Sequence, residues 1–224
     1  MTEYTPLPLP DHIALPPEQA LAEAEAFRTR MAKRHSVRDF ADTPVDAAVI
    51  RAAIATAGGA PSGANQQPWF FAAIRSPAMK AQVRAAAEEE ERAFYGGGGG
   101  DAWLKALEPI GTGASKPHLD ICPWLIVIFA QRWGEKPEGE KRKHYYVPES
   151  VGIATGFLIA ALHHAGLSTL THTPNPMKFL NALCGRPDNE KPVMILAVGH
   201  AAKDAKVPAV AKVKKPLDQI MSIL

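Results

Sequence analysis

One stretch constrains the fold more than any other: residues 61–69, with the sequence PSGANQQPW. Two prolines, a glycine and three amide side chains cannot continue a helix or a strand, so we expect a shaped loop. A helical pattern that ends at 57–59 enters this loop, and an apolar run from Trp69 leaves it. Such loops commonly present binding groups, and Gly63 would let a flat ligand approach the backbone. An ordinary turn is the alternative, and the loop alone does not decide between them.

The composition excludes several classes of protein. A net charge of +2 is too small to indicate nucleic acid or an anionic membrane as the main partner. The longest apolar stretch, 151–165, is shorter than the roughly 20 residues that a membrane span needs. The N-terminus lacks the pattern of a signal peptide. Cys122 and Cys184 are too few for a disulfide framework and lack metal-ligand spacing, so we expect no metal and a reducing, cytoplasmic environment.

The 224 residues are enough for one domain with a sizeable core. The prolines of residues 1–15 predict an extended N-terminal arm, and residues 16–224 then form a single domain. Apolar spacing and breaker residues predict helices over residues 16–31, 46–58, 76–95, 150–165 and 177–184. Apolar runs bounded by turn residues predict strands over residues 69–75, 123–130, 167–173 and 192–199. The charged segment 133–144 is expected to be a loop.

Five consecutive glycines, Gly96 to Gly100, are expected to interrupt regular structure. We therefore predict a mobile insertion over about residues 96–117. Because this segment carries Trp103 and Lys116, it is either a lid that orders around a ligand or a plain surface loop.

Charged groups flank these elements. Four glutamates end at Glu91; three are expected to form a solvated helical face, whereas Glu91 shares a face with Tyr95.

In the segment 34–38, two guanidinium groups flank a serine, which suits phosphate binding, with a solvated basic turn as the alternative. The C-terminal arm, about 203–224, becomes apolar after Pro216, so we expect it to pack on this chain or on a partner subunit.

Several motifs together resemble a known family. They are RHSVR at 34–38, PSGAN at 61–65, THTP at 171–174, GRP at 185–187 and KPLDQIM at 215–221. With Glu91 and Tyr95, they are similar to the flavin-dependent nitroreductase superfamily, and within it to the iodotyrosine deiodinase branch. The resemblance covers about residues 20–224.

This resemblance implies a nitroreductase-like α+β fold, in which helices surround a mainly antiparallel sheet. It also implies an intertwined homodimer with FMN at the interface. The membrane anchor of animal members has no counterpart here, so a cytoplasmic form with no membrane and no nucleic-acid partner is expected.

The resemblance also implies roles for individual residues. FMN contacts fall on Arg34, His35, Ser36, Arg38, Ser62, Thr171, His172, Thr173 and Lys214, with the Thr173 hydroxyl at flavin N5 as the catalytic contact. Substrate contacts fall on the Ala64 N–H and on Glu91, Tyr95 and Lys116. In this trio the carboxylate would pair with the ammonium of an amino acid and the lysine with its carboxylate. His35 and Lys214 stand where arginine is usual.

The implied activity is FMN-dependent reductive dehalogenation of halotyrosines, in which 3-iodotyrosine becomes tyrosine and iodide. NAD(P)H or a reductase would supply the electrons. One alternative is an NAD(P)H-dependent nitroreductase or quinone reductase of broad aromatic specificity. Another is a protein that binds flavin or halotyrosine without turnover.

Overall fold

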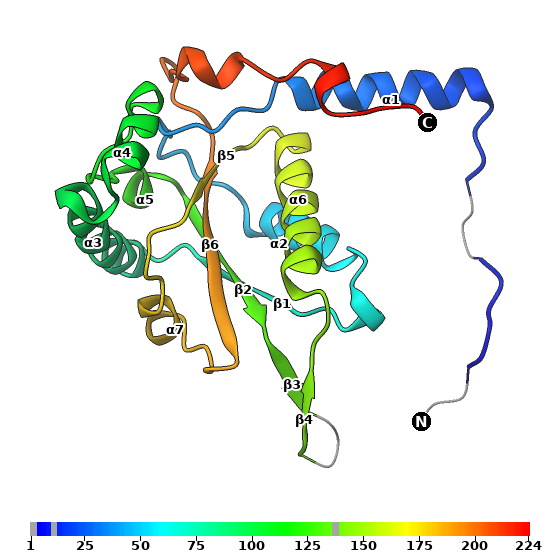
Figure 1. Ribbon diagram of the computed structural model, residues 1–224, viewed down its shortest axis with the longest axis horizontal. Coiled ribbons are helices and arrows are strands. Elements are labelled where there is room, and N and C mark those ends of the chain that lie inside the picture. Colours follow the sequence, from blue (N-terminus) through cyan, green and yellow to red (C-terminus); the bar gives the residue numbers. More distant parts are fainter. Residues whose placement is uncertain (1–3, 10–12, 136–138) are drawn as a thin grey trace. The chain divides into compact units, whose positions relative to one another are not determined.

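A computed structural model gives the structure of the protein and describes residues 4–9, 13–135 and 139–224 (Figure 1). The chain divides into two units, residues 1–34 and 35–224, which we describe separately. The first unit contains α1 (Pro17–Ala32), which begins at a proline as predicted. No residue of α1 is buried, and Leu21 and Phe27, which belong to the apolar spacing that predicted this helix, are exposed.

The second unit is built on a four-stranded antiparallel sheet. Its strands, in the order β1-β2-β6-β5, are β1 (Trp69–Ile74), β2 (Trp124–Gln131), β6 (Glu190–Gly199) and β5 (Ser168–His172). All three strand pairs are antiparallel, which confirms the predicted mainly antiparallel sheet. Every residue of β2 except Gln131 is buried, as its continuous apolar sequence predicts.

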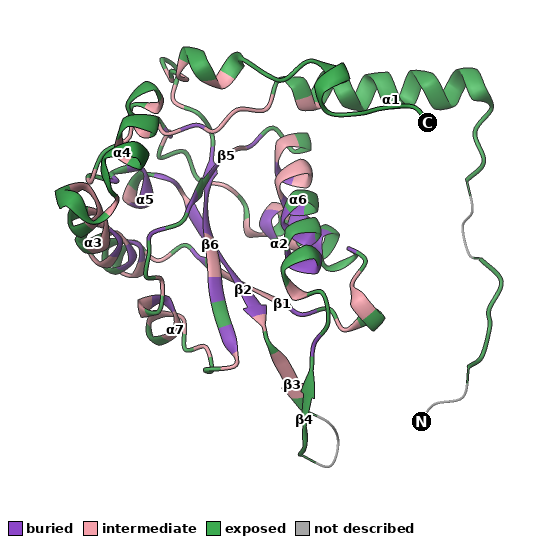
Figure 2. Cartoon of the chain, viewed as in Figure 1, coloured by how far each residue is buried: buried purple, intermediate pink, exposed green. Residues whose placement is uncertain are grey.

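Helices cover both faces of this sheet (Figure 1). One face carries α2 (Ala47–Gly58) and α6 (Val147–His164), and the other carries α3 (Pro77–Ala93), α5 (His118–Ile121) and α7 (Phe179–Leu183). Successive side chains of a strand point to opposite faces. Leu125 and Phe129 of β2 therefore pack with the α3 side, and Ile126 and Ile128 with the α2–α6 side. Figure 2 shows the buried residues gathered along β2 and β6.

Two of the helices start at the residues that the sequence predicts. The Asp46 carboxylate accepts a hydrogen bond from the Ala48 N–H at 2.7 Å and caps α2. The Ser76 hydroxyl accepts from the Met79 N–H at 3.4 Å, and Pro77 occupies the first turn of α3. Among the described residues, no helix combines the length and apolar character that a membrane crossing needs.

Two predictions on local structure are wrong. The segment 133–144 was expected to be a loop, but β3 (Trp133–Glu135) and β4 (Lys141–Lys143) pair as a short antiparallel hairpin. The Lys141 ammonium lies 4.3 Å from the centre of the Trp133 ring, which helps to join the two strands. Helix α6 begins at Val147, three residues earlier than predicted, because Pro148 fits the first turn of a helix.

The glycine run also forms regular structure, contrary to the prediction. Residues Phe94–Gly98 form a π-helical turn that continues α3, followed by α4 (Asp101–Leu107) and a 3₁₀ turn, η3 (Glu108–Ile110). The rings of Phe94 and Trp103 meet edge to face, 4.9 Å apart, and hold α4 against the end of α3. Gly97 and Gly100 have φ of 122° and 71°, so glycine is needed there to turn the chain between the helices.

The C-terminal arm contains two short turns, η4 (Ala209–Lys212) and η5 (Leu217–Gln219). Turn η4 contacts η3 of the glycine-rich segment. Ile220 and Met221 are exposed, so the apolar end of this arm is not buried within the chain.

We expect Leu125→Ala to destabilise the protein strongly. The Leu125 side chain is fully buried in the α3-side core, so truncation should cost about 2–5 kcal/mol in the free energy of unfolding. Urea unfolding measures this cost. The matched change Leu224→Ala, at an exposed terminal leucine, should alter the free energy of unfolding by no more than about 0.5 kcal/mol. Equal effects of the two substitutions would contradict the position assigned to β2.

Candidate functional site

Three predicted substrate-binding residues lie together at the end of α3. Lys116 Nζ is 3.1 Å from Glu91 Oε2, and the two side chains are only 5% and 12% exposed. The same ammonium lies 5.5 Å from the centre of the Tyr95 ring and donates to Thr112 Oγ1 at 3.1 Å. We call Glu91, Tyr95 and Lys116 the clamp. It holds opposite charges in a nearly enclosed place, where ion pairs are weakly screened.

A second layer of charge fixes the backbone of the clamp. Glu88 Oε1 accepts from the Lys116 N–H at 2.6 Å and from Arg84 Nε at 2.8 Å. Arg84 also donates to Asp120 Oδ2 at 2.7 Å, and so ties α5 to α3. Burial alone would raise the pKa of Glu88, but these hydrogen bonds bring it below its usual value. The expectation that Glu88 merely forms part of a solvated face is therefore wrong.

Two buried histidines adjoin the clamp. The His118 and His172 rings lie 5.9 Å apart, edge to face, and His172 Nε2 is 3.7 Å from Glu91 Oε1. Burial lowers the pKa of His118 to about 4 and that of His172 to about 3, and the charge of Lys116 adds to both shifts. Both rings are therefore neutral at pH 7. In the described part of the chain, neither Nε2 atom has a hydrogen-bond partner.

The basic segment lies beside β5. Ser36 forms a parallel bridge with Thr169, and the Val37 N–H donates to the Thr169 carbonyl at 3.2 Å. The charge of Arg38 makes a smaller contribution to the lowered pKa of His118 and of His172.

The structure thus places several of the predicted FMN contacts in β5 or beside it. They are Ser36, Arg38, Thr171, His172 and Thr173, of which both threonines are exposed and His172 is buried. His35 is half-buried, and Lys214 is exposed in the C-terminal arm. Arg34 ends the first unit, so its predicted phosphate contact stays a prediction, as does that of Lys214.

The loop at 61–68 has an unusual backbone. Ala64, Asn65 and Gln67 have φ of 50°, 51° and 48°, a left-handed conformation that costs a non-glycine residue roughly 1–2 kcal/mol. The Ser62 hydroxyl accepts from the Gln67 N–H at 2.9 Å and closes the loop on itself. Strain of this kind concentrates at functional sites, which favours the binding loop over an ordinary turn.

Contacts with residues 143–150 hold this loop in place. The Gln66 side chain donates to the Lys143 carbonyl and accepts from the Tyr145 N–H at 2.7 Å. The Gly63 N–H donates to Ser150 Oγ at 3.4 Å. A Cβ added at Gly63 would lie 2.9 Å from the Tyr145 carbonyl oxygen. The close approach of the protein's own backbone therefore requires glycine at position 63. We had expected the approach of a ligand to be the reason.

The loop and the clamp lie on opposite sides of the sheet within one chain (Figure 1). The loop leaves α2 and contacts the start of α6, whereas the clamp belongs to α3 and to the segment before α5. Ser62 and Ala64 are therefore not brought to Glu91 and Lys116 by a single copy of the chain. Among the described residues, no cluster of side chains suits a metal ion.

Sequence reasoning missed four residues of this site: Arg84, Glu88, His118 and Asp120. The spacing of Arg84 and Glu88, four apart on one helix, could have indicated their ion pair. His118, two residues after Lys116, carried no signal in sequence, because its importance comes from the contact with His172.

We expect stability to fall as the medium becomes acidic. In the unfolded chain, His118 and His172 take up protons near pH 6.5, but in the folded protein only near pH 4 and pH 3. The unfolded state therefore binds more protons in this range, so the free energy of unfolding decreases as the pH falls. Each histidine can contribute up to about 1.4 kcal/mol of this decrease per pH unit. Urea unfolding between about pH 7 and about pH 5 measures the slope.

The slope should become shallower in His118→Phe, which keeps a ring in place but cannot titrate. His164→Gln, at an exposed histidine, serves as the control and should leave it unchanged. An unaltered slope in His118→Phe would contradict the buried, neutral state of this ring.

Comparisons with known proteins identify the family of the chain. The model of the nitroreductase family matches residues 31–200. The iodotyrosine deiodinase of Haliscomenobacter hydrossis is 45% identical over 192 residues, which are 86% of each chain. Human iodotyrosine deiodinase 1 is 42% identical over 211 residues, which are 94% of this chain and 72% of that protein.

Solved structures show the same similarity. An iodotyrosine deiodinase bound to FMN and 3-iodo-L-tyrosine matches with a TM-score of 0.73 and 26% identity, over 88% of this chain and 97% of that one. A nitroreductase from Bacteroides fragilis with bound FMN matches with a TM-score of 0.65 at 16% identity, over 88% and 98% of the two chains. The latter similarity supports the fold alone.

Proposed function

The chain belongs to the nitroreductase family, within its iodotyrosine deiodinase group, and we propose that it is an FMN-dependent reductive dehalogenase of halotyrosines. The reaction converts 3-iodotyrosine to tyrosine and iodide. The observation that carries this proposal is the enclosed clamp, in which Glu91 and Lys116 present opposite charges beside Tyr95.

The clamp fits the amino-acid end of a tyrosine-like substrate. Such a substrate carries an ammonium and a carboxylate, which match the charges of Glu91 and Lys116. When the substrate enters, Glu91 pairs with its ammonium and Lys116 with its carboxylate, in place of their pairing with each other. No charge is then left unpaired. The segment 96–117 closes over the substrate as a lid and excludes water, which strengthens these pairs. This arrangement would select amino-acid phenols over plain nitroaromatics.

The residues in and beside β5 suit FMN. Ser36 and Arg38 offer a hydroxyl and a guanidinium to phosphate or to the polar edge of the flavin. Within the described residues, His172 Nε2 has no hydrogen-bond partner. The Thr173 hydroxyl, exposed at the strand end, would donate to N5. Arg34, His35, Ser62, Thr171 and Lys214 complete the proposed set of contacts. Reduced FMN would supply the two electrons that, with one proton, replace the carbon–halogen bond by a carbon–hydrogen bond and release halide.

The separation of the loop and the clamp supports a homodimer with composite sites. In this arrangement, the strained loop of one copy offers the Ala64 N–H to the substrate phenolate, and the clamp of the other copy holds the amino-acid end. The exposed apolar side chains of α1 and of the C-terminal arm, which include Phe27 and Ile220, would pack between the copies.

Two further proposals concern the cellular setting. Cys122 and Cys184 are both free thiols, which fits a cytoplasmic enzyme. The electrons would come from NAD(P)H or from a reductase.

We expect Glu91→Gln to lower kcat/KM for 3-iodotyrosine by roughly 10- to 100-fold, because a charge-assisted hydrogen bond is worth about 1.5–3 kcal/mol. The protein should still bind FMN. The measurement is iodide release after anaerobic reduction of the flavin. Glu89→Gln, at an exposed neighbour in the same helix, should behave like the parent protein. Unchanged deiodination in Glu91→Gln with FMN bound would disprove the substrate assignment.

We expect two impaired variants to restore activity to each other in a mixed dimer. Glu91→Gln impairs the clamp, and Ala64→Pro disrupts the loop, because proline lacks an N–H and cannot adopt the φ of 50° found at Ala64. If the sites are composite, a dimer with one chain of each kind has one site in which both parts are intact. Differently tagged chains allow the mixed dimer to be purified and assayed for iodide release. A mixed dimer no more active than its parents would argue against composite sites.

A further inference from the structure

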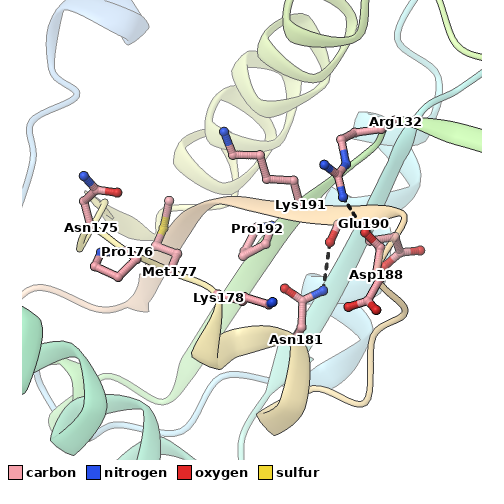
Figure 3. Close-up of a pocket in the computed structure, with 10 residues that line it drawn as sticks. All are labelled: Arg132, Asn175, Pro176, Met177, Lys178, Asn181, Asp188, Glu190, Lys191 and Pro192. Carbon is pink, nitrogen blue, oxygen red and sulfur yellow. Dashed lines mark hydrogen bonds between the residues drawn. The ribbon is translucent and has the colours of Figure 1, made fainter.

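A cavity lies apart from the clamp, at the start of β6. Its volume is about 490 Å³, and it is bounded by β6, α7 and the segment that follows β5 (Figure 3). The lining residues are Arg132, Asn175, Pro176, Met177, Lys178, Asn181, Asp188, Glu190, Lys191 and Pro192. Nothing in the proposed dehalogenation uses this cavity.

The cavity has an excess of positive charge. Arg132, Lys178 and Lys191 line it, and all three are exposed. In the described part of the chain, neither lysine pairs with a carboxylate. These cations are therefore available to an anionic ligand.

The acidic groups of the lining do not cancel this charge. Glu190 is buried, and its two oxygens accept from Arg186 at 2.7 Å each, with a further bond from Gln131 at 3.0 Å. Its charge is thus already neutralised by a residue outside the lining. Asp188 is the remaining acid against three cations.

Two polar side chains of the lining are held in fixed positions (Figure 3). Arg132 Nη2 donates to the Asp188 carbonyl at 2.6 Å, which orients the guanidinium and leaves other N–H groups for a ligand. Asn181 Nδ2 donates to the carbonyls of Pro187 and Glu190 at 3.1 and 2.8 Å. Preorganised polar groups lose little freedom when a ligand binds.

The rest of the lining is apolar. Pro176, Met177 and Pro192 offer flat or flexible hydrophobic surface, and a methionine sulfur makes favourable contacts with aromatic rings. The volume falls within the range of small-molecule sites and is larger than a bare inorganic anion needs. A ligand that suits all of these features combines negative charge with a flat ring.

We propose that this cavity binds an organic phosphate of nucleotide size. The phosphate groups lie against Arg132, Lys178 and Lys191, and the base lies against Pro176, Met177 and Pro192. The proposal is independent of the dehalogenase assignment, because none of its residues belongs to the clamp, the loop or the proposed FMN contacts.

Calorimetric titration of ADP into the FMN-loaded protein tests this proposal, because the flavin site is then already filled. We expect saturable binding of one ADP per chain. In Lys178→Gln/Lys191→Gln, ADP should bind at least tenfold more weakly, since two charge-assisted contacts are lost. Both lysines are exposed, so the fold should be unaffected. Lys203→Gln/Lys206→Gln, which removes two exposed lysines elsewhere, is the matched control and should bind ADP like the parent.

Two further ligands separate the contribution of the phosphate groups from that of the base. Adenosine should bind much more weakly than ADP if the cations act on phosphate, and pyrophosphate should bind more weakly than ADP if the apolar wall holds the base. The proposal is overturned if ADP shows no saturable binding, or if both double variants bind it equally. It is also overturned if adenosine or pyrophosphate alone binds as tightly as ADP.

Discussion

The ion pair between Glu91 and Lys116 is the constraint on which the rest of the site depends. Burying one of these charges alone would cost several kcal/mol. Each side chain therefore requires the other, or a ligand group with the same charge as that partner. Arg84, Glu88 and Asp120 hold the two backbones at the distance that this pairing needs. In the proposed reaction, a zwitterion can separate the pair and leave both charges satisfied.

The antiparallel sheet sets a second condition on function. Because helices cover both of its faces, the loop at 61–68 and the clamp cannot meet in one copy of the chain. The strained backbone of Ala64 is nevertheless fixed, by Gln66 and by the residues before α6. A loop held so firmly fits the proposal that it serves a site completed by another copy.

Sequence could predict those parts whose cause is local. The caps at Asp46 and Ser76 and the continuous apolar run of β2 each depend on a few neighbouring residues, and all were found. The β3–β4 hairpin was missed because two three-residue strands rich in lysine carry no apolar alternation. Glu88 and His118 were missed because their partners, Lys116 and His172, lie far away in sequence. The helical glycine run depends in the same way on the contact between Phe94 and Trp103.

Strand β2 serves two cores at once, with alternate residues directed to α3 and to α6. Inserting a single amino acid in its middle would exchange these two sets of side chains and mismatch both layers together. Homologous chains should therefore keep β2 at constant length. Insertions and deletions should instead accumulate at the connection between β3 and β4, where a change of length leaves both cores intact.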